Sequence, residues 1–238
     1  MNTQFRKYDD LPLVTLAPCI ETRNDQTNVS ILECIGKEMD RYLGLVAENK
    51  DKNLSEIAKM FSNSSDHSHN IQSKALRSGF LEKITFTIPG RKGPPMSVPV
   101  LTDKAKRLLG LSAERIARSG GASHRGMLNI CCLSLQQKGF IVTKESNGHD
   151  ILAKSKNEEI TIYEIVGPFS SLNDQLEHLR KSSMKVVFVV TNRKSAEQLR
   201  RFIQSRARSE DLHRMKIEFF GSFYGDLRAA TDADSKEF

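Results

Sequence analysis

One stretch of the sequence, residues 147–166, constrains the fold more than any other. Its hydrophobic pattern predicts two antiparallel strands, at 149–154 and 160–166, joined by a polar turn. Asp150 lies at the start of the first strand and Glu164 near the end of the second. A carboxylate on an apolar strand face is costly to bury alone. The two acids therefore either share a hard divalent cation or face water separately.

Helical and strand patterns flank this pair on both sides. Apolar residues recur at helical spacing over 122–138, 170–181 and 195–206, and further strands are expected at 140–142, 185–190 and 216–220. The run KVVFVV at 185–190 is apolar throughout, which is typical of a strand covered on both faces. The order of these elements predicts an α/β (α+β) fold, with a mixed sheet flanked by helices.

This order resembles the PD-(D/E)XK nuclease-like fold, in which a helix, a three-strand meander, a helix and another strand follow one another. In that family an Asp lies on the second strand and a Glu-x-Lys on the third. Asp150 matches the Asp, and Glu164 matches the Glu. The resemblance implies a deoxyribonuclease in which these two residues hold Mg²⁺ and act in catalysis. The ion would lower the pKa of a bound water and stabilise the charge developing on phosphate.

One position departs from that family. The family's lysine would fall on Val166, and a valine can neither orient nor activate a water molecule. Lys154, four residues past Asp150 on the same strand, is the expected catalytic substitute, and Gln175 and His178 on the next helix are further ones. An inactive, nuclease-like domain that only binds DNA is the other interpretation.

A second recognisable arrangement occupies residues 28–110. The sequence predicts a long helix at 28–49, two helices at 54–61 and 67–78, strands at 84–88 and 97–101, and a helix at 103–109. Asp66 and Thr102 are the expected N-caps of the helices that they precede. A basic turn, PGRKGPP, joins the two strands. Helix, turn, helix and hairpin in this order resemble a winged helix-turn-helix domain.

That resemblance implies contact with double-stranded DNA, with the second helix of the motif in the major groove and the hairpin turn on the backbone. The DNA-binding residues that it implies are Asn70, Gln72, Ser73, Lys74 and Arg77 on the helix, and Arg91 and Lys92 in the turn.

The charge distribution agrees with DNA binding. From Ile71 to Arg125, eleven Lys and Arg stand against three Asp and Glu, a net charge of +8, whereas the whole chain carries +7. The basic excess therefore lies in this region, and phosphate contacts from such a surface supply most non-specific affinity. A solvated basic surface without a nucleic-acid partner is the alternative.

A linker at 111–121 joins the two regions, and the string SGGASHRG leads into the next helix. Ser123 is the expected N-cap of that helix. His124 and Arg125 lie at its start, where backbone amides favour phosphate and an arginine adds a fork of donors. These two residues are therefore either a clamp on the DNA backbone or a cap and a surface charge.

A further resemblance covers most of the chain. The order of a short LPLVTL strand, a long helix, a winged helix and a joint at Gly120, Gly121, His124 and Arg125 is similar to the region after the motor in HerA-like and conjugation-associated ATPases. The chain contains no G-x-x-x-x-G-K-[ST] string, so the resemblance implies either a separate ATPase as partner or a stand-alone relative. The apolar face of the long helix packs on its neighbours or, alternatively, forms the seam of a homodimer.

The expected organisation is an extended arm at 1–27, a winged helix domain at 28–110, the linker, a nuclease-like domain at 122–225 and a mobile acidic tail at 226–238. No apolar run approaches the ~20 residues that cross a bilayer, and the first twelve residues lack the apolar core of a secretory signal. The four cysteines have no zinc-finger spacing and are expected to be reduced thiols, which suits the cytoplasm. The alternative function is a winged-helix transcriptional regulator whose C-terminal domain dimerises or senses a ligand.

Overall fold

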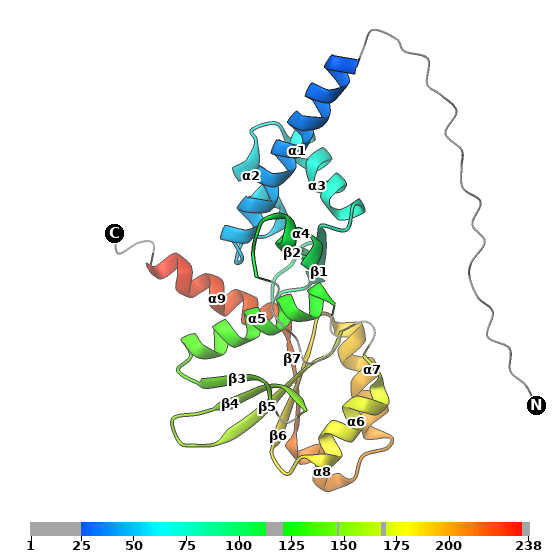
Figure 1. The fold of residues 1–238 in the computed structure, drawn as a ribbon. Coiled ribbons are helices and arrows are strands. Elements are labelled where there is room, and N and C mark those ends of the chain that lie inside the picture. The colour runs from blue at the N-terminus through cyan, green and yellow to red at the C-terminus, as the bar shows by residue number, and fades with distance from the viewer. Residues whose placement is uncertain (1–24, 113–120, 147, 168–169, 235–238) are drawn as a thin grey trace, which may run out of the picture. The chain divides into compact units, whose positions relative to one another are not determined.

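The computed structural model describes residues 25–112, 121–146, 148–167 and 170–234 (Figure 1). The strand expected at 11–16 and most of the linker lie outside these residues. A division between Lys37 and Glu38 separates two units of the chain, and all contacts below belong to the second unit. Among the described residues, none of the helices is both long enough and apolar enough to span a bilayer.

Helices around a two-stranded hairpin form the N-terminal part of this unit. Their shared core includes Tyr42, Leu43 and Ile57, which are completely buried. The elements are α1 Asp25–Glu48, of which the residues from Glu38 on belong to this unit, α2 Leu54–Phe61, α3 Ser65–Arg77, β1 Leu81–Phe86, β2 Met96–Leu101 and α4 Asp103–Leu108. β1 and β2 are antiparallel, with Ile84 opposite Val98.

Side-chain caps fix where these helices begin. Thr102 caps α4, as predicted, by accepting the N–H of Ala105. The Asp66 cap predicted for α3 is wrong, because the hydroxyl of Ser64 accepts the N–H of His67 instead. α3 therefore begins two residues earlier than the sequence pattern indicated.

The C-terminal part holds a five-stranded mixed sheet in the order β3-β4-β5-β6-β7 (Figure 1). β3, β4 and β5 form an antiparallel meander, and β5, β6 and β7 run parallel. The strands are β3 Ile141–Ser146, β4 His149–Lys154, β5 Ile160–Ile165, β6 Lys185–Val190 and β7 Met215–Phe219. The predicted mixed sheet is confirmed, and β4 and β6 have the predicted bounds.

Helices cover both faces of the sheet. Figure 1 shows α5 Ala122–Gln137 and α9 Phe220–Asp234 on one side, and α6 Leu172–Lys181 and α7 Arg193–Gln204 on the other. A short helix that the sequence pattern did not indicate, α8 Ser209–Arg214, precedes β7. Side chains alternate along β5, so Ile162 packs into the α6 and α7 cluster while Tyr163 and Ile165 pack into the α5 and α9 cluster.

The hairpin contributes to the core of the sheet. Ile84, Phe86 and Val98 belong to the same buried cluster as α5 and α9. The Phe86 ring meets the rings of Phe220 and Tyr224 edge-on, with centroids 4.9 and 5.1 Å apart. The hairpin and the sheet are therefore joined by one continuous apolar core.

The stretch from Asp226, expected to be a mobile tail, is helical as far as Asp234. Leu227 is buried, and Arg228 donates to both carboxylate oxygens of Glu56 on α2, at 2.9 and 2.7 Å. Sequence reasoning missed this helix because its acidic residues obscure an apolar side, which the hairpin, α5 and β5 cover.

α9 approaches the hairpin so closely that Gly221→Ala is expected to destabilise the fold. A Cβ at Gly221 would lie 2.2 Å from the backbone oxygen of Thr87, which cannot yield as a side chain can. We expect a loss of about 1–3 kcal/mol in the free energy of unfolding, measured by urea denaturation.

Gly225→Ala is the matched control in the same helix, because a Cβ there would meet nothing within 4 Å. Alanine favours a helix interior over glycine, so this variant should gain roughly 0.5–1 kcal/mol. Equal stability of the two variants would contradict the close packing of α9 on the hairpin.

Candidate functional site

The two acids singled out in the sequence lie at neighbouring positions of β4 and β5. Ile151 pairs with Tyr163, and the next residue outward on each strand is Asp150 and Glu164. The ladder stops there, because the Asp150 carboxylate accepts the backbone N–H of Ile165 through Oδ2 at 2.7 Å. The side chain of Asp150 thus replaces a backbone partner and satisfies a buried donor.

The other oxygen of Asp150 faces the start of α5. Asp150 is 7% exposed, and its Oδ1 lies 3.3 Å from His124 Nε2. The hydrogen bond to Asp150 raises the pKa of His124 above the usual histidine value, although burial acts in the opposite direction. The His124 imidazolium is therefore favoured at this position.

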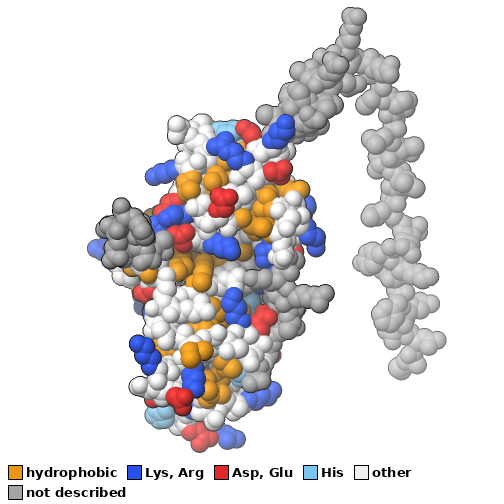
Figure 2. Space-filling view, turned by 60° about the vertical axis from the view of Figure 1, so that its left-hand side comes forward, with side chains coloured by type: hydrophobic (Ala, Val, Ile, Leu, Met, Phe, Trp, Pro, Cys, Tyr) orange, Lys and Arg blue, Asp and Glu red, His pale blue; other side chains and the backbone are white. Residues whose placement is uncertain are grey.

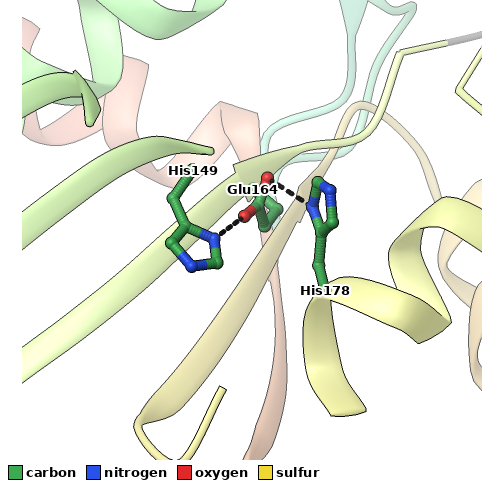
Figure 3. A group of neighbouring side chains, drawn as sticks. All are labelled: His149, Glu164 and His178. Carbon is green, nitrogen blue, oxygen red and sulfur yellow. Dashed lines mark hydrogen bonds and ion pairs between the residues drawn. The ribbon is translucent and has the colours of Figure 1, made fainter. Parts of the chain in front are cut away.

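A second network surrounds Glu164, which is only 1% exposed (Figure 3). Its Oε1 lies 2.6 Å from His149 Nδ1 and its Oε2 lies 3.1 Å from His178 Nδ1. Figure 3 shows the carboxylate between the two rings, with His149 coming from β4 and His178 from α6. The two imidazoles meet edge-on, with centroids 5.8 Å apart.

The local sequence explains how α6 delivers His178. Ser171 caps the helix by accepting the N–H of Asp174, and Leu176 and Leu179 are buried against the sheet. His178 lies between these two leucines in sequence, so the helix holds it beside the sheet. His178 was one of the substitutes expected to reach the site, and that expectation is confirmed.

His149, Glu164 and His178 each offer one ligand atom, and these three atoms all lie within 4.8 Å of one another. Within the part of the chain that the structure describes, this is the one group of three or more such residues that satisfies this distance. Their donors are two imidazole nitrogens and one carboxylate oxygen, so the group can hold a metal ion.

The structure does not bring every expected residue to this place. Lys154 lies at the other end of β4, where its ammonium is 2.9 Å from Glu158. Val166 is buried in the apolar cluster under α6. Gln175 is buried on α6, and its Oε1 has no hydrogen-bond partner among the described residues.

The start of α5 also differs from expectation. Ser123 is not the N-cap, since the helix begins at Ala122 after Gly121. The Glu82 carboxylate accepts both the N–H and the hydroxyl of Ser123, at 2.8 and 2.7 Å, and so occupies this positive end of the helix dipole. Arg125 binds Asp103 at 2.7 Å, whereas its neighbour His124 faces Asp150.

The residues expected to contact DNA lie on α3 and in the turn between β1 and β2. Asn70, Ser73, Arg77, Arg91 and Lys92 are exposed, while Gln72 and Lys74 are half-buried. On the face drawn in Figure 2, basic side chains are interspersed with acidic and hydrophobic ones.

His149 is the site residue that sequence reasoning missed. Strict alternation along β4 would direct His149 and Asp150 to opposite faces. In the structure, Asp150 turns toward the backbone of β5 and accepts the Ile165 N–H. His149, the residue before Asp150, contacts the Glu164 carboxylate. The only sequence clue is that His149 directly precedes Asp150 at the start of the strand.

The chain was compared with known protein families, proteins and structures. No family model matches the chain, and searches of the curated proteins and of the solved structures find no match.

The contact between His124 and Asp150 predicts a measurable titration effect. Asp150→Asn should lower the pKa of His124, followed by NMR, because the acceptor loses its charge. Since the folded protein raises this pKa, the contact stabilises the wild type fully below the usual histidine pKa. That stabilisation is lost as pH rises through the raised pKa.

Asp226→Asn supplies the control, because Asp226 is exposed and pairs with Lys138, the residue that follows α5. It should leave the His124 titration unchanged. An equal shift in both variants would mean that Asp150 does not hold the imidazolium.

Proposed function

We propose that this protein binds duplex DNA through α3 and the β1–β2 turn, and that its C-terminal sheet is a nuclease-like domain that hydrolyses a DNA phosphodiester bond. Hydrolysis joins a water oxygen to phosphorus and breaks the bond from phosphorus to one sugar oxygen, which takes up a proton from that water. DNA is the proposed partner, and the resemblance at Gly121, His124 and Arg125 adds a separate ATPase.

The observation that carries the nuclease-like interpretation is the order and pairing of α5, β3, β4, β5, α6 and β6. This order resembles that of the PD-(D/E)XK core, which has an Asp on the second strand of the meander and a Glu on the third. Asp150 and Glu164 occupy these places and lie on adjacent strands of the sheet. Fold alone does not fix an activity, so the residues at the strand ends must carry it.

The metal implied by that resemblance, Mg²⁺, suits these residues poorly. Mg²⁺ takes oxygen ligands in near-octahedral geometry. The carboxylate of Glu164 faces two imidazole nitrogens, and that of Asp150 is bound to a backbone N–H and to His124. One carboxylate between two histidines is not a set of hard oxygen donors.

The DNA-binding half of the proposal is supported by the arrangement of α2, α3 and the hairpin. It resembles a winged helix, with α3 as the helix that enters the major groove. Arg91 and Lys92 are exposed in the turn, where they can contact backbone phosphates.

One observation favours a second candidate, a nuclease-like domain that no longer cuts. Val166 packs with Ile162 and Leu176 in the core, so the position of the family lysine provides no proton-transferring or cationic group. In that case the protein would hold DNA without cleaving it.

Removal of the two charges of the turn is expected to weaken DNA binding without regard to sequence. Arg91→Ala with Lys92→Ala should reduce affinity for duplex DNA and lower the slope of log K against log salt by about two. Fluorescence anisotropy over a range of salt concentrations measures both quantities.

Lys181→Ala with Lys185→Ala removes the same charge from exposed positions at the end of α6 and at the start of β6. The start of β6 is the end of that strand away from the hairpin. This control should retain the wild-type affinity and salt slope. Equal losses of affinity in both double variants would indicate a general effect of charge and not a contact between the β1–β2 turn and DNA.

A palindromic footprint on DNA that does not change when the C-terminal site is altered would support the alternative function, a transcriptional regulator.

Cleavage is tested by incubating the protein with plasmid DNA and each of Mg²⁺, Mn²⁺, Co²⁺ and Zn²⁺. Wild type should nick the plasmid with at least one ion, and Asp150→Ala and Glu164→Ala should each slow nicking by at least about 100-fold. Cleavage that survives both substitutions places the active site elsewhere. Retained DNA binding with no cleavage under any ion establishes the non-cutting candidate.

A further inference from the structure

The carboxylate of Glu164 is buried in the sheet and has two imidazole neighbours. It is 1% exposed, whereas the side chains of His149 and His178 are 15% and 24% exposed. A buried carboxylate needs a compensating partner, and the two histidines supply it from opposite sides. Because each ring retains some solvent exposure, the group is reachable from outside.

We propose that His149, Glu164 and His178 form a binding site for a divalent first-row transition metal ion, of the class of Zn²⁺ or Co²⁺. Imidazole nitrogen suits these ions, whereas Mg²⁺ and Ca²⁺ take oxygen ligands. Two imidazoles and one carboxylate on one ion leave further positions for water or substrate, as in catalytic zinc sites.

The three donor atoms are close enough for one ion to draw them together. One ligand atom from each residue lies within 4.8 Å of the other two. His149 Nδ1 is 2.6 Å from Oε1 of Glu164 and His178 Nδ1 is 3.1 Å from Oε2, so the two imidazoles contact different oxygens of the carboxylate. Ligands about 2.0 Å from a tetrahedral ion lie roughly 3.3 Å from one another, so entry of the ion requires side-chain shifts on the order of 1 Å.

The donors come from three separate elements of the fold. β4 supplies His149, the central strand β5 supplies Glu164, and α6 supplies His178. β4 and β5 are paired along four residues, and α6 packs on the sheet through Leu176 and Leu179. The site is thus held by the sheet and its covering helix, and no described loop residue belongs to it.

Asp150 lies outside the proposed ligand set, which separates this site from the one that the nuclease resemblance implies. Its two oxygens are engaged by the Ile165 N–H and by His124. A Mg²⁺ site of the family kind would lose its ion on Asp150→Asn. The site proposed here would lose its ion on His178→Ala and retain it on Asp150→Asn.

The inference names the metal of the proposed nuclease-like domain and in that sense rests on it. Metal uptake and DNA binding are nonetheless separate measurements on the same full-length protein. Loss of DNA affinity in the Arg91 and Lys92 variant with normal metal uptake would show that the turn binds DNA, and would leave this inference intact. Absence of metal uptake with normal DNA binding would concern only this inference.

The experiment is a titration of the full-length, chelator-treated protein with Co²⁺, followed by the visible absorption of the bound ion and by calorimetry. Wild type should bind one Co²⁺, which Zn²⁺ displaces and excess Mg²⁺ does not. His149→Ala and His178→Ala should each weaken binding by at least about 100-fold. Asp150→Asn should stay within about tenfold of wild type.

His69→Ala is the matched control, because His69 is an exposed histidine on α3. Circular dichroism of each metal-free variant shows whether it is folded, and the two histidine variants test the site independently if Glu164→Gln does not fold. The inference is overturned if folded wild type binds no Co²⁺ or Zn²⁺. It is also overturned if both histidine variants bind as wild type does, if Mg²⁺ displaces Co²⁺, or if Asp150→Asn alone abolishes binding.

Discussion

A carboxylate buried in the middle of a sheet is the constraint on which the C-terminal half of this protein depends. β5 pairs with β4 on one side and β6 on the other, and Glu164 lies on it with 1% of its surface exposed. Such a group is tolerated only with partners, and both partners are histidines from neighbouring elements. The requirement ties β4 and α6 to the end of β5.

The second acid resolves the same problem in another way. Asp150 accepts the backbone N–H of Ile165 on β5, so its side chain replaces a backbone acceptor where the pairing of β4 with β5 ends. Its remaining oxygen orients His124 at the start of α5. The two carboxylates, adjacent on the sheet, are thereby committed to separate networks. One is connected to the helix on one face of the sheet, and the other to the helix on the opposite face.

The hairpin and the sheet are mechanically linked. Phe86 of β1 packs between Phe220 and Tyr224 of α9, and Arg228 of that helix binds Glu56 of α2. Burial acts to raise the pKa of Glu56, but the hydrogen bonds from Arg228 and from the Asn53 N–H, together with the charges of Arg228 and Lys52, lower it below the usual value. The hairpin therefore shares one buried core with β5.

Local patterns in the sequence were sufficient for most elements. The continuous apolar run at β6 and the alternation at β5 identified strands, because the spacing of apolar residues along a strand reflects which of its faces are buried. Thr102, the N-cap, likewise predicted the start of α4 from local sequence alone. α9 was missed, because its apolar residues are spaced among small and acidic ones and their partners lie on the hairpin, on α5 and on β5.

The sequence by itself determined the mixed sheet, the position of Asp150 and Glu164 on adjacent strands, and the presence of a valine, Val166, two residues past Glu164. Tertiary structure alone decided which groups meet those acids. His149, His178 and His124 come from elements up to fifty-four residues apart in the chain, and Lys154 was kept at the far end of its strand. Side-chain contacts of this kind depend on the residue at which the pairing of two strands ends and on the position at which a helix packs against the sheet. The local pattern of hydrophobic residues determines neither.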